Sequence, residues 1–232
     1  MEKVKSFIKK NFPGLVPIVR YIKIQTSQFR AVEPIFTEIY HKNFWEDPVS
    51  RSGPGSNLIQ TKVIREELPI LVQEIGARSL LDIPCGDFYW MKEVELDVDL
   101  YIGADVIQEL VTDNIKRYGN KKRHFVKLDI IKDRLPQVDL LFCRDLLDHF
   151  SNRHIFRAIK NIKKSNSKYL LTTTFASSEK NENIIPGEWW PLNLQKAPFY
   201  FPSYIKIINE NCTDQNGRFS GKSLGLWKIT DI

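Results

Sequence analysis

Four acidic residues occupy positions in this chain where a carboxylate could bind a ligand. Asp82 and Asp87 flank a turn that contains Gly86; two carboxylates suit a cationic ammonium group, and the glycine lets a ligand approach without a Cβ in the way. Asp105 follows 23 residues after Asp82 and could accept hydrogen bonds from both hydroxyls of a ribose. Asp129 could accept a hydrogen bond from the exocyclic amine of an adenine.

The elements around these acids predict a parallel sheet. Apolar stretches typical of strands alternate with helical patterns, and the strand candidates are SLLDI (79–83), LYIGADV (100–106), HFVKLDI (124–130), VDLLFC (138–143) and KYLLTTTF (168–175). The chain closes with PSYIKIINEN (202–211) and SLGLWKI (223–229), which predict a hairpin. We therefore expect an α/β fold with a Rossmann-like, doubly wound, seven-stranded sheet, mostly parallel with a C-terminal antiparallel hairpin.

The four acids would then share one edge of the sheet, because ligands of an open parallel sheet bind outside the carboxyl ends of its strands. Together they describe a ligand with an amino-acid end, a ribose and an adenine. S-adenosylmethionine is such a ligand, and we expect it as the cofactor. A nicotinamide-dependent reductase is disfavoured, because its cofactor-binding loop requires a G-x-G-x-x-G or similar pattern. Pro84-Cys85-Gly86-Asp87 does not have this pattern.

The segment from about Ser79 to Phe175 resembles the class I S-adenosylmethionine-dependent methyltransferases. LLDIPCGDF lies where that family has its acidic, glycine-rich cofactor loop, YIGADV where it has the ribose-binding acid, VKLDI where it has the adenine-side acid, and VDLLFCRDLLDHF where its fourth strand ends at the active site. The family's loop usually carries three glycines, whereas this one keeps Gly86 alone.

A narrower resemblance covers the chain from about Phe44 on. The stretches SGPGS, PCGDFYWM, CRDLLDHF, LLTTTF, PLNLQ and KSLGLW resemble a group of bacterial and viral methyltransferases associated with surface polysaccharide synthesis. This resemblance implies an enzyme that transfers a methyl group to a hydroxyl of a sugar or glycan intermediate. The alternatives are a methyltransferase of another small molecule and a non-catalytic cofactor-binding scaffold protein.

The resemblance also implies which residues form the cofactor site. We expect contacts from Asp82, Pro84, Cys85, Gly86, Asp87, Phe88, Trp90, Asp105, Val106, Asp129, Ile130, Cys143 and Arg144. Cys85 and Cys143 are interpreted as small residues beside the cofactor rather than as nucleophiles. Arg144 is a candidate for binding an anionic substrate group or for a structural ion pair.

Two residues after the fourth predicted strand are candidate catalytic bases. His149 could take the proton of an acceptor hydroxyl as its oxygen attacks the sulfonium methyl group, or it could instead fix the loop or line the cofactor. Asp145 is the competing base. Methyl transfer needs no metal ion, because the sulfonium is already an activated donor, and we predict no metal site. The alternative is a divalent ion bound by carboxylate oxygens of Asp145 and Asp148, for which the spacing is not specific.

The segment 184–202 is predicted to contact the acceptor. Trp189 and Trp190 could stack on the CH faces of a sugar, while the amides of Asn193 and Gln195 bind hydroxyls. A packed lid is the alternative. We expect a sugar, a nucleotide sugar or a glycan as the substrate.

The charge of the chain is concentrated at its beginning. Residues 1–30 hold seven basic residues and one acidic residue, which leaves 27 basic (34 less 7) and 27 acidic (28 less 1) residues beyond them. A nucleic-acid methyltransferase would need a basic face around its active site, so we predict no nucleic-acid partner. Residues 1–30 could instead contact an anionic membrane surface or a partner; the alternative is a solvated helix that caps the domain.

The domain organisation follows from a break at EDPVSRSGPGSN (46–57). We expect a basic N-terminal helical arm at 1–50 and a methyltransferase domain at 51–232, with Ser56 as the N-cap of the next helix. SGPGS within the break is interpreted as a hinge, with a flap over the cofactor as the alternative. His154 is expected on the surface.

The cellular location is predicted from two absences in the sequence. No stretch approaches the roughly eighteen apolar residues that span a bilayer, and the three widely spaced cysteines suggest neither a disulfide framework nor a zinc site. We expect a cytoplasmic protein whose arm can reach the inner membrane face.

Overall fold

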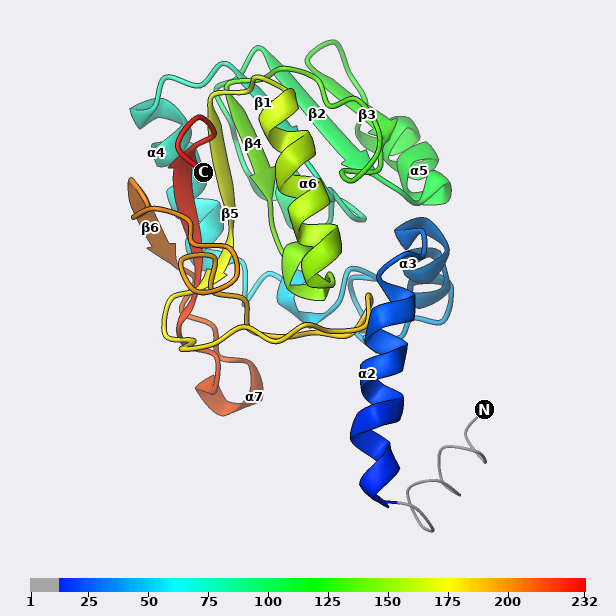
Figure 1. Cartoon of the computed structure of the whole chain (residues 1–232). Helices are drawn as coiled ribbons and strands as arrows, with labels where there is room; N and C mark the ends of the chain where they lie inside the picture. The colour runs from blue at the N-terminus through cyan, green and yellow to red at the C-terminus, as the bar shows by residue number, and fades with distance from the viewer. Residues whose placement is uncertain (1–12) are drawn as a thin grey trace.

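The computed structural model describes residues 13–232, and a seven-stranded sheet forms their centre (Figure 1). The strand order is β3-β2-β1-β4-β5-β7-β6; β1 to β5 run parallel, and β7 is antiparallel to both β5 and β6. This confirms the predicted fold, including the antiparallel hairpin. The strands are β1 Ser79–Asp82, β2 Leu100–Asp105, β3 Arg123–Lys127, β4 Leu140–Cys143, β5 Tyr169–Phe175, β6 Lys206–Asn209 and β7 Lys222–Lys228.

Helices cover both faces of the sheet because successive strand residues point to opposite sides. In β4, Leu140 packs with the cluster that contains helix α4, while Leu141 packs with the cluster that contains α6. Figure 1 shows α6 lying across one face. The longer helices are α2 Val16–Ser27, α3 Val32–His41, α4 Lys62–Glu74, α5 Gln108–Tyr118 and α6 Asn152–Lys164; the short ones are η1 Pro13–Leu15, η2 Pro54–Ser56, η3 Met91–Glu93, η4 Leu147–His149 and α7 Asp214–Gly217.

Two expectations about local structure were wrong. Ser56 does not cap a helix: Asn57 Oδ1 accepts hydrogen bonds from the amides of Ile59 and Gln60, each at 2.9 Å, and this turn delays the start of α4 to Lys62. His154 is not on the surface but fully buried. Its Nε2 hydrogen-bonds the Arg30 carbonyl at 3.0 Å, so the histidine joins α6 to the α2–α3 connection.

Helix α3 belongs to the core of the sheet domain. Val32 and Phe36 are buried in the same cluster as α6. The first 12 residues of the predicted arm lie outside the described residues, and the domain boundary at residue 50 stays a prediction. None of the helices within 13–232 is both long and apolar enough to cross a membrane.

Asp139 joins three strands at the amino edge of the sheet. Its Oδ2 accepts hydrogen bonds from the Arg78 amide and from the Ser79 amide and hydroxyl at 2.8–3.0 Å, and Lys168 lies 2.5 Å from Oδ1. Burial alone would raise the pKa of Asp139, but these donors outweigh it and lower the pKa to about 2.

Asp139→Asn is therefore expected to lower the free energy of unfolding at pH 7 by about 2 kcal/mol. The folded-state pKa lies below the unfolded one, so the stabilisation is present above about pH 4 and is lost as the pH falls through 2. Urea denaturation of both proteins at pH 7 and pH 3 measures the difference. Asp97→Asn, which removes an exposed carboxylate paired with Arg78, is the control and should barely change the unfolding midpoint. A difference independent of pH would contradict this account.

Candidate active site

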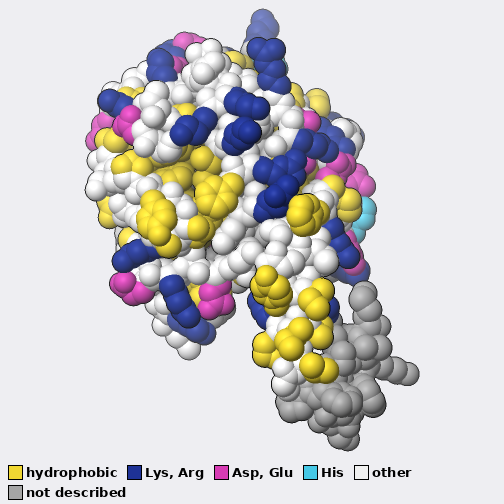
Figure 2. All heavy atoms as spheres, in the orientation of Figure 1, with side chains coloured by type: hydrophobic (Ala, Val, Ile, Leu, Met, Phe, Trp, Pro, Cys, Tyr) yellow, Lys and Arg dark blue, Asp and Glu magenta, His cyan; other side chains and the backbone are white. Residues whose placement is uncertain are grey.

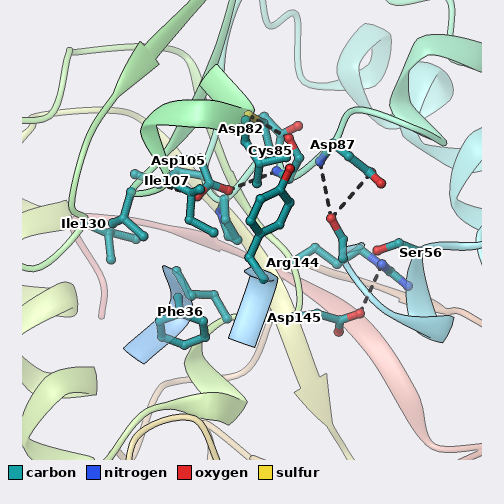
Figure 3. Close-up of a pocket in the computed structure, with 18 of the residues that line it drawn as sticks. Phe36, Ser56, Asp82, Cys85, Asp87, Asp105, Ile107, Ile130, Arg144 and Asp145 are labelled. Atoms are coloured by element: carbon teal, nitrogen blue, oxygen red, sulfur yellow. Dashed lines mark hydrogen bonds and ion pairs between the residues drawn. The ribbon is translucent and has the colours of Figure 1, made fainter. Parts of the chain in front are cut away.

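The carboxyl ends of β1, β2, β3 and β4 surround a cavity, and α3 supplies a further wall (Figure 3). Most of the residues predicted to bind a cofactor line it: Asp82, Pro84, Cys85, Gly86, Asp87, Trp90, Asp105, Val106, Asp129, Ile130 and Arg144. Two predicted residues do not. Phe88 packs against Tyr101 and Phe125 in the core, and Cys143 lies fully buried in the sheet. We call this space the first cavity.

The loop after β1 is shaped by Gly86, which has a φ of +53°. Its amide donates to Asp105 Oδ2 at 3.2 Å, and its carbonyl accepts from Asn114 Nδ2 at 2.8 Å. Asp105 Oδ1 accepts a second bond from the Ile107 amide at 3.0 Å. Asp105 at the end of β2 thus holds both its own loop and the loop of the neighbouring strand.

Segment 50–52 is fastened to the same loop through Asp87. The Asp87 carboxylate accepts hydrogen bonds from the Ser50 hydroxyl at 2.9 Å and the Arg51 amide at 3.0 Å, and the Asp87 amide donates to the Ser52 hydroxyl at 3.3 Å. Ser52 and Ser56 both line the first cavity. The stretch predicted to be a hinge is therefore a wall of the site.

Burial raises the pKa of two carboxyl groups in the first cavity. The pKa of Asp82 rises to about 7, against a hydrogen bond from the Tyr101 hydroxyl that favours the charged form. The pKa of Asp105 rises to about 6, against the Ile107 and Gly86 amides. A bound cation or hydroxyl donor would favour the ionised form of both groups.

The opposite side of the first cavity is apolar, since Ile107, Leu110, Leu128 and Ile130 line it. Asp129 lies beside them, but its Oδ1 already accepts a hydrogen bond from the Ile131 amide at 2.9 Å. A flat, mostly apolar group such as a purine matches this side.

Four charged residues form a mostly buried cluster at the wall of the first cavity. Arg144 Nη2 lies 2.7 Å from Glu210 Oε2, and Arg144 Nη1 lies 3.0 Å from Asp145 Oδ2. Lys222 Nζ lies 2.6 Å from the same Asp145 oxygen and 3.4 Å from Glu210. Burial alone would raise the pKa of Asp145, but the positive charges of Arg144 and Lys222 lower it. Arg144 was predicted either to bind an anionic substrate group or to form a structural ion pair, and the structure shows the ion pair.

A second cavity adjoins the first and shares Trp45, Ser52 and Asp145 with it. Its other walls include the aromatic residues Phe175, Trp189 and Phe219 and the polar residues Asp148, His149, Asp214 and Lys222. Within residues 13–232, no group of three or more His, Cys, Asp or Glu side chains is arranged to hold a metal ion.

His149 is held in one orientation at the second cavity. Its Nδ1 lies 3.1 Å from the Glu188 carbonyl oxygen, which can only accept, so Nδ1 carries the hydrogen in the neutral ring. The ring packs against Trp45, with centroids 5.4 Å apart. Nε2 is then left without a proton and can accept one.

Asp148 has a carboxyl oxygen without a partner. The side chain is buried, and Oδ2 accepts a hydrogen bond from Trp189 Nε1 at 2.9 Å, whereas Oδ1 has no hydrogen-bond partner among residues 13–232. Burial raises the pKa of Asp148. A buried polar atom left unpaired is costly, and a ligand hydroxyl in the second cavity would satisfy it.

Of the four residues predicted to contact the acceptor, one lines the second cavity and three do not. Trp189 lines it, in edge contact with Phe175 and Phe219. Trp190 donates to the Lys180 carbonyl, Asn193 is buried and donates to the carbonyls of Ala176 and Ser178, and Gln195 donates to the Pro202 carbonyl. These three side chains hold the segment together.

Several residues of the two cavities and of the charged cluster beside them were not found from the sequence: Phe36, Tyr40, Trp45, Glu210 and Lys222. Asp148 was considered from the sequence only as a possible oxygen ligand of a divalent ion, although its position directly before His149 also indicates the second cavity. Phe36 and Lys222 had none, since they come from distant segments whose positions only the folded chain decides.

Gly86 and Gly76 offer a matched test of how the 50–52 segment is held. Both have positive φ, +53° and +63°, but only at Gly86 would an added Cβ meet another residue, 2.2 Å from Ser52 Oγ. Each Gly→Ala change should cost about 1 kcal/mol of stability. Gly86→Ala alone should also displace segment 50–52 and speed hydrogen exchange of the Arg51 and Asp87 amides, measured by NMR. Equal exchange in the two variants would show that the contact does not hold the segment.

Comparison with known proteins gives likenesses of structure only: no protein-family model and no curated protein matches the chain. The N-methyltransferase NodS from Bradyrhizobium japonicum, in complex with S-adenosyl-L-homocysteine, aligns with a TM-score of 0.58 at 11% identity over 82% of this chain and 97% of that one. The methyltransferase domain of bacterial CtHen1 aligns with a TM-score of 0.54 at 14% identity over 74% and 98%.

An S-adenosylmethionine-dependent methyltransferase from Clostridium acetobutylicum is similar to a comparable degree. It aligns with a TM-score of 0.51 at 11% identity over 72% of this chain and 91% of that one. Each alignment covers more than two thirds of this chain, and therefore most of the seven-stranded sheet domain. The fold of this chain is therefore that of the class I S-adenosylmethionine-dependent methyltransferases.

Proposed function

We propose that this protein transfers a methyl group from S-adenosylmethionine to a hydroxyl of a sugar or glycan intermediate. The observation that carries the proposal is the pair of adjoining cavities that share Asp145. One has the acids and apolar surface that suit a nucleoside, and the other has aromatic walls with polar groups among them. A donor and an acceptor bound in the two cavities would meet at the residues they share.

The residues of the first cavity fit the cofactor. Asp105 would accept hydrogen bonds from the ribose hydroxyls, Ile107 and Ile130 would contact the adenine, and the acids around Gly86 would attract the positively charged amino-acid end. When bound, S-adenosylmethionine supplies a methyl group already activated by its sulfonium. The task of the protein is to align the acceptor and to remove its proton.

The residues of the second cavity fit a sugar. Rings such as Trp189 and Phe219 can cover the CH face of a pyranose, and the unpaired Asp148 Oδ1 can accept a hydrogen bond from one of its hydroxyls. A scaffold protein that merely binds the cofactor would not need this second cavity, so its presence favours the enzyme.

His149 is the better of the two candidate bases. The Asp145 carboxylate is paired with Arg144 and Lys222, which lower its pKa and make it a weak proton acceptor. His149 has no cationic partner, and its Nδ1 bond to the Glu188 carbonyl leaves Nε2 free to accept the proton of an acceptor hydroxyl. Asp145, at the boundary of the two cavities, would help to position the acceptor.

The first test is cofactor binding by titration calorimetry. Asp105→Ala is expected to weaken binding of S-adenosylmethionine and S-adenosylhomocysteine by roughly tenfold or more, because it removes charged acceptors from the ribose and loosens the Gly86 loop. Asp113→Ala, which removes an exposed acid from α5, is the control and should bind normally. Unchanged affinity in Asp105→Ala would contradict the assignment of this cavity.

The affinity for S-adenosylmethionine should also depend on pH. The free protein holds part of its Asp82 and Asp105 in the protonated form near pH 6 to 7, and the bound cation favours the carboxylates. Binding should therefore release protons and strengthen as the pH rises from 5.5 to 8. Calorimetry in buffers of different ionisation enthalpy measures the released protons; absence of proton release at pH 6 would refute the raised pKa values.

The second test is methyl transfer itself, with radiolabelled S-adenosylmethionine and a panel of nucleotide sugars, glycans and lipid-linked oligosaccharides. With an accepted substrate, His149→Asn should lower kcat by about 10²–10⁴-fold, because Asn can keep the hydrogen bond to the Glu188 carbonyl but cannot accept the proton. Its cofactor affinity should not change. His124→Asn, on exposed β3, is the control. Transfer to an amine but to no hydroxyl would favour a methyltransferase of another class.

A further inference from the structure

Helix α2 exposes an apolar side to solvent. Leu15, Ile18, Tyr21 and Ile22 are 45–63% exposed, and they recur at the spacing that places residues on one side of a helix. Figure 2 shows hydrophobic side chains gathered along this helix, where it extends from the body. Such a continuous row of exposed apolar side chains usually marks an interaction surface.

The side of α2 nearest the protein carries polar residues, although the side chain of Arg20 on it stays half exposed. Arg20 pairs with Glu188 through both nitrogens of its guanidinium, at 3.1 and 3.2 Å, and Ser27 is the buried residue of the helix. A surface helix of a globular domain normally buries its apolar side against the core. α2 instead leaves much of its apolar surface exposed, so these side chains are available to a partner outside the chain.

The charge of this region points to the nature of that partner. From Lys3 to Val32 the sequence has seven basic residues and no acidic one. A helix with an exposed apolar side in a strongly basic segment is the combination that binds anionic lipid surfaces. A second copy of the chain would bring another seven positive charges to the same place, and the two segments would repel one another.

We propose that α2 docks this protein on the surface of an anionic lipid bilayer. Leu15, Ile18, Tyr21 and Ile22 insert at the boundary of headgroups and acyl chains, and the positive charge of the surrounding sequence attracts the anionic headgroups. The insertion needs no rearrangement of the domain, because these side chains are already exposed.

The position of α2 connects docking with the candidate active site. Figure 1 shows α2 extending away from the sheet on the side of the carboxyl ends of the parallel strands, where both cavities lie. Glu188, the partner of Arg20, directly precedes Trp189, and its carbonyl orients His149. Docking would hold the acceptor wall near the bilayer and favour a lipid-attached acceptor; this last step rests on the proposed function.

Vesicle co-sedimentation tests the proposal without any measurement of activity. The full chain should bind vesicles of phosphatidylcholine mixed with phosphatidylglycerol at least about tenfold more tightly than vesicles of phosphatidylcholine alone, and high salt should weaken the binding. The double change Ile18→Glu/Ile22→Glu should reduce binding to the mixed vesicles by at least about tenfold, since it places two negative charges on the inserted side.

The matched control is Ile70→Glu/Ile115→Glu, which changes two isoleucines of similar exposure, 48% and 51%, on α4 and α5. It should bind vesicles like the original protein. Both variants should keep the affinity for S-adenosylhomocysteine of the original protein, which shows that they are folded and separates this test from that of the methyl transfer. Equal vesicle binding by the two variants would overturn the proposal. So would a dimer in light scattering that only the α2 variant abolishes, because the exposed side would then bind a second copy.

Discussion

Arg144 is a buried cation, and a buried cation must be paired; much of the site depends on how it is paired. Its guanidinium, at the end of β4, binds Glu210 just after β6 and the carbonyl of Gly55 in the segment before α4. Lys222, at the start of β7, completes the cluster by binding Asp145 and Glu210. This cluster of charges thus joins the parallel sheet, the antiparallel hairpin and the segment before α4 that forms part of the wall of both cavities.

The same cluster divides the acids of the site into two kinds. For Asp82 and Asp105 burial is the largest effect and raises the pKa of each, although the charge of Arg144 acts against it at Asp82. Asp145 is less enclosed, and two cations lower its pKa. Acids with a raised pKa become more ionised when a cation binds beside them, which suits a cavity that binds a cation. An acid with a lowered pKa stays charged, which suits a residue that must hold one position between two cavities.

The second cavity is built from segments far apart in the chain, and hydrogen bonds between backbones hold them together. The Gly187 amide donates to the His149 carbonyl, and the Trp190 amide donates to the Asp148 carbonyl. These bonds join the loop after β4 to the segment after β5. Arg20 of α2 binds the Glu188 side chain, and the Glu188 carbonyl binds the candidate base His149, so Glu188 links α2 to that base.

The sequence by itself determined the sheet and the acids at its edge. Strand periodicity is a local property, and a parallel sheet must bring the ends of its strands to one side, so the positions of Asp82, Asp105 and Asp129 followed from their places in the chain. Only the tertiary structure decided the rest. Ser52 and Lys222 bind partners 35 and 77 residues away in the chain, and folding buries Asp148 with one carboxyl oxygen unpaired. The polar residues Asn193 and Gln195 bind backbone carbonyls rather than a ligand. Side-chain types show what a residue can bind; which partner it meets is set by long-range packing, which no local pattern contains.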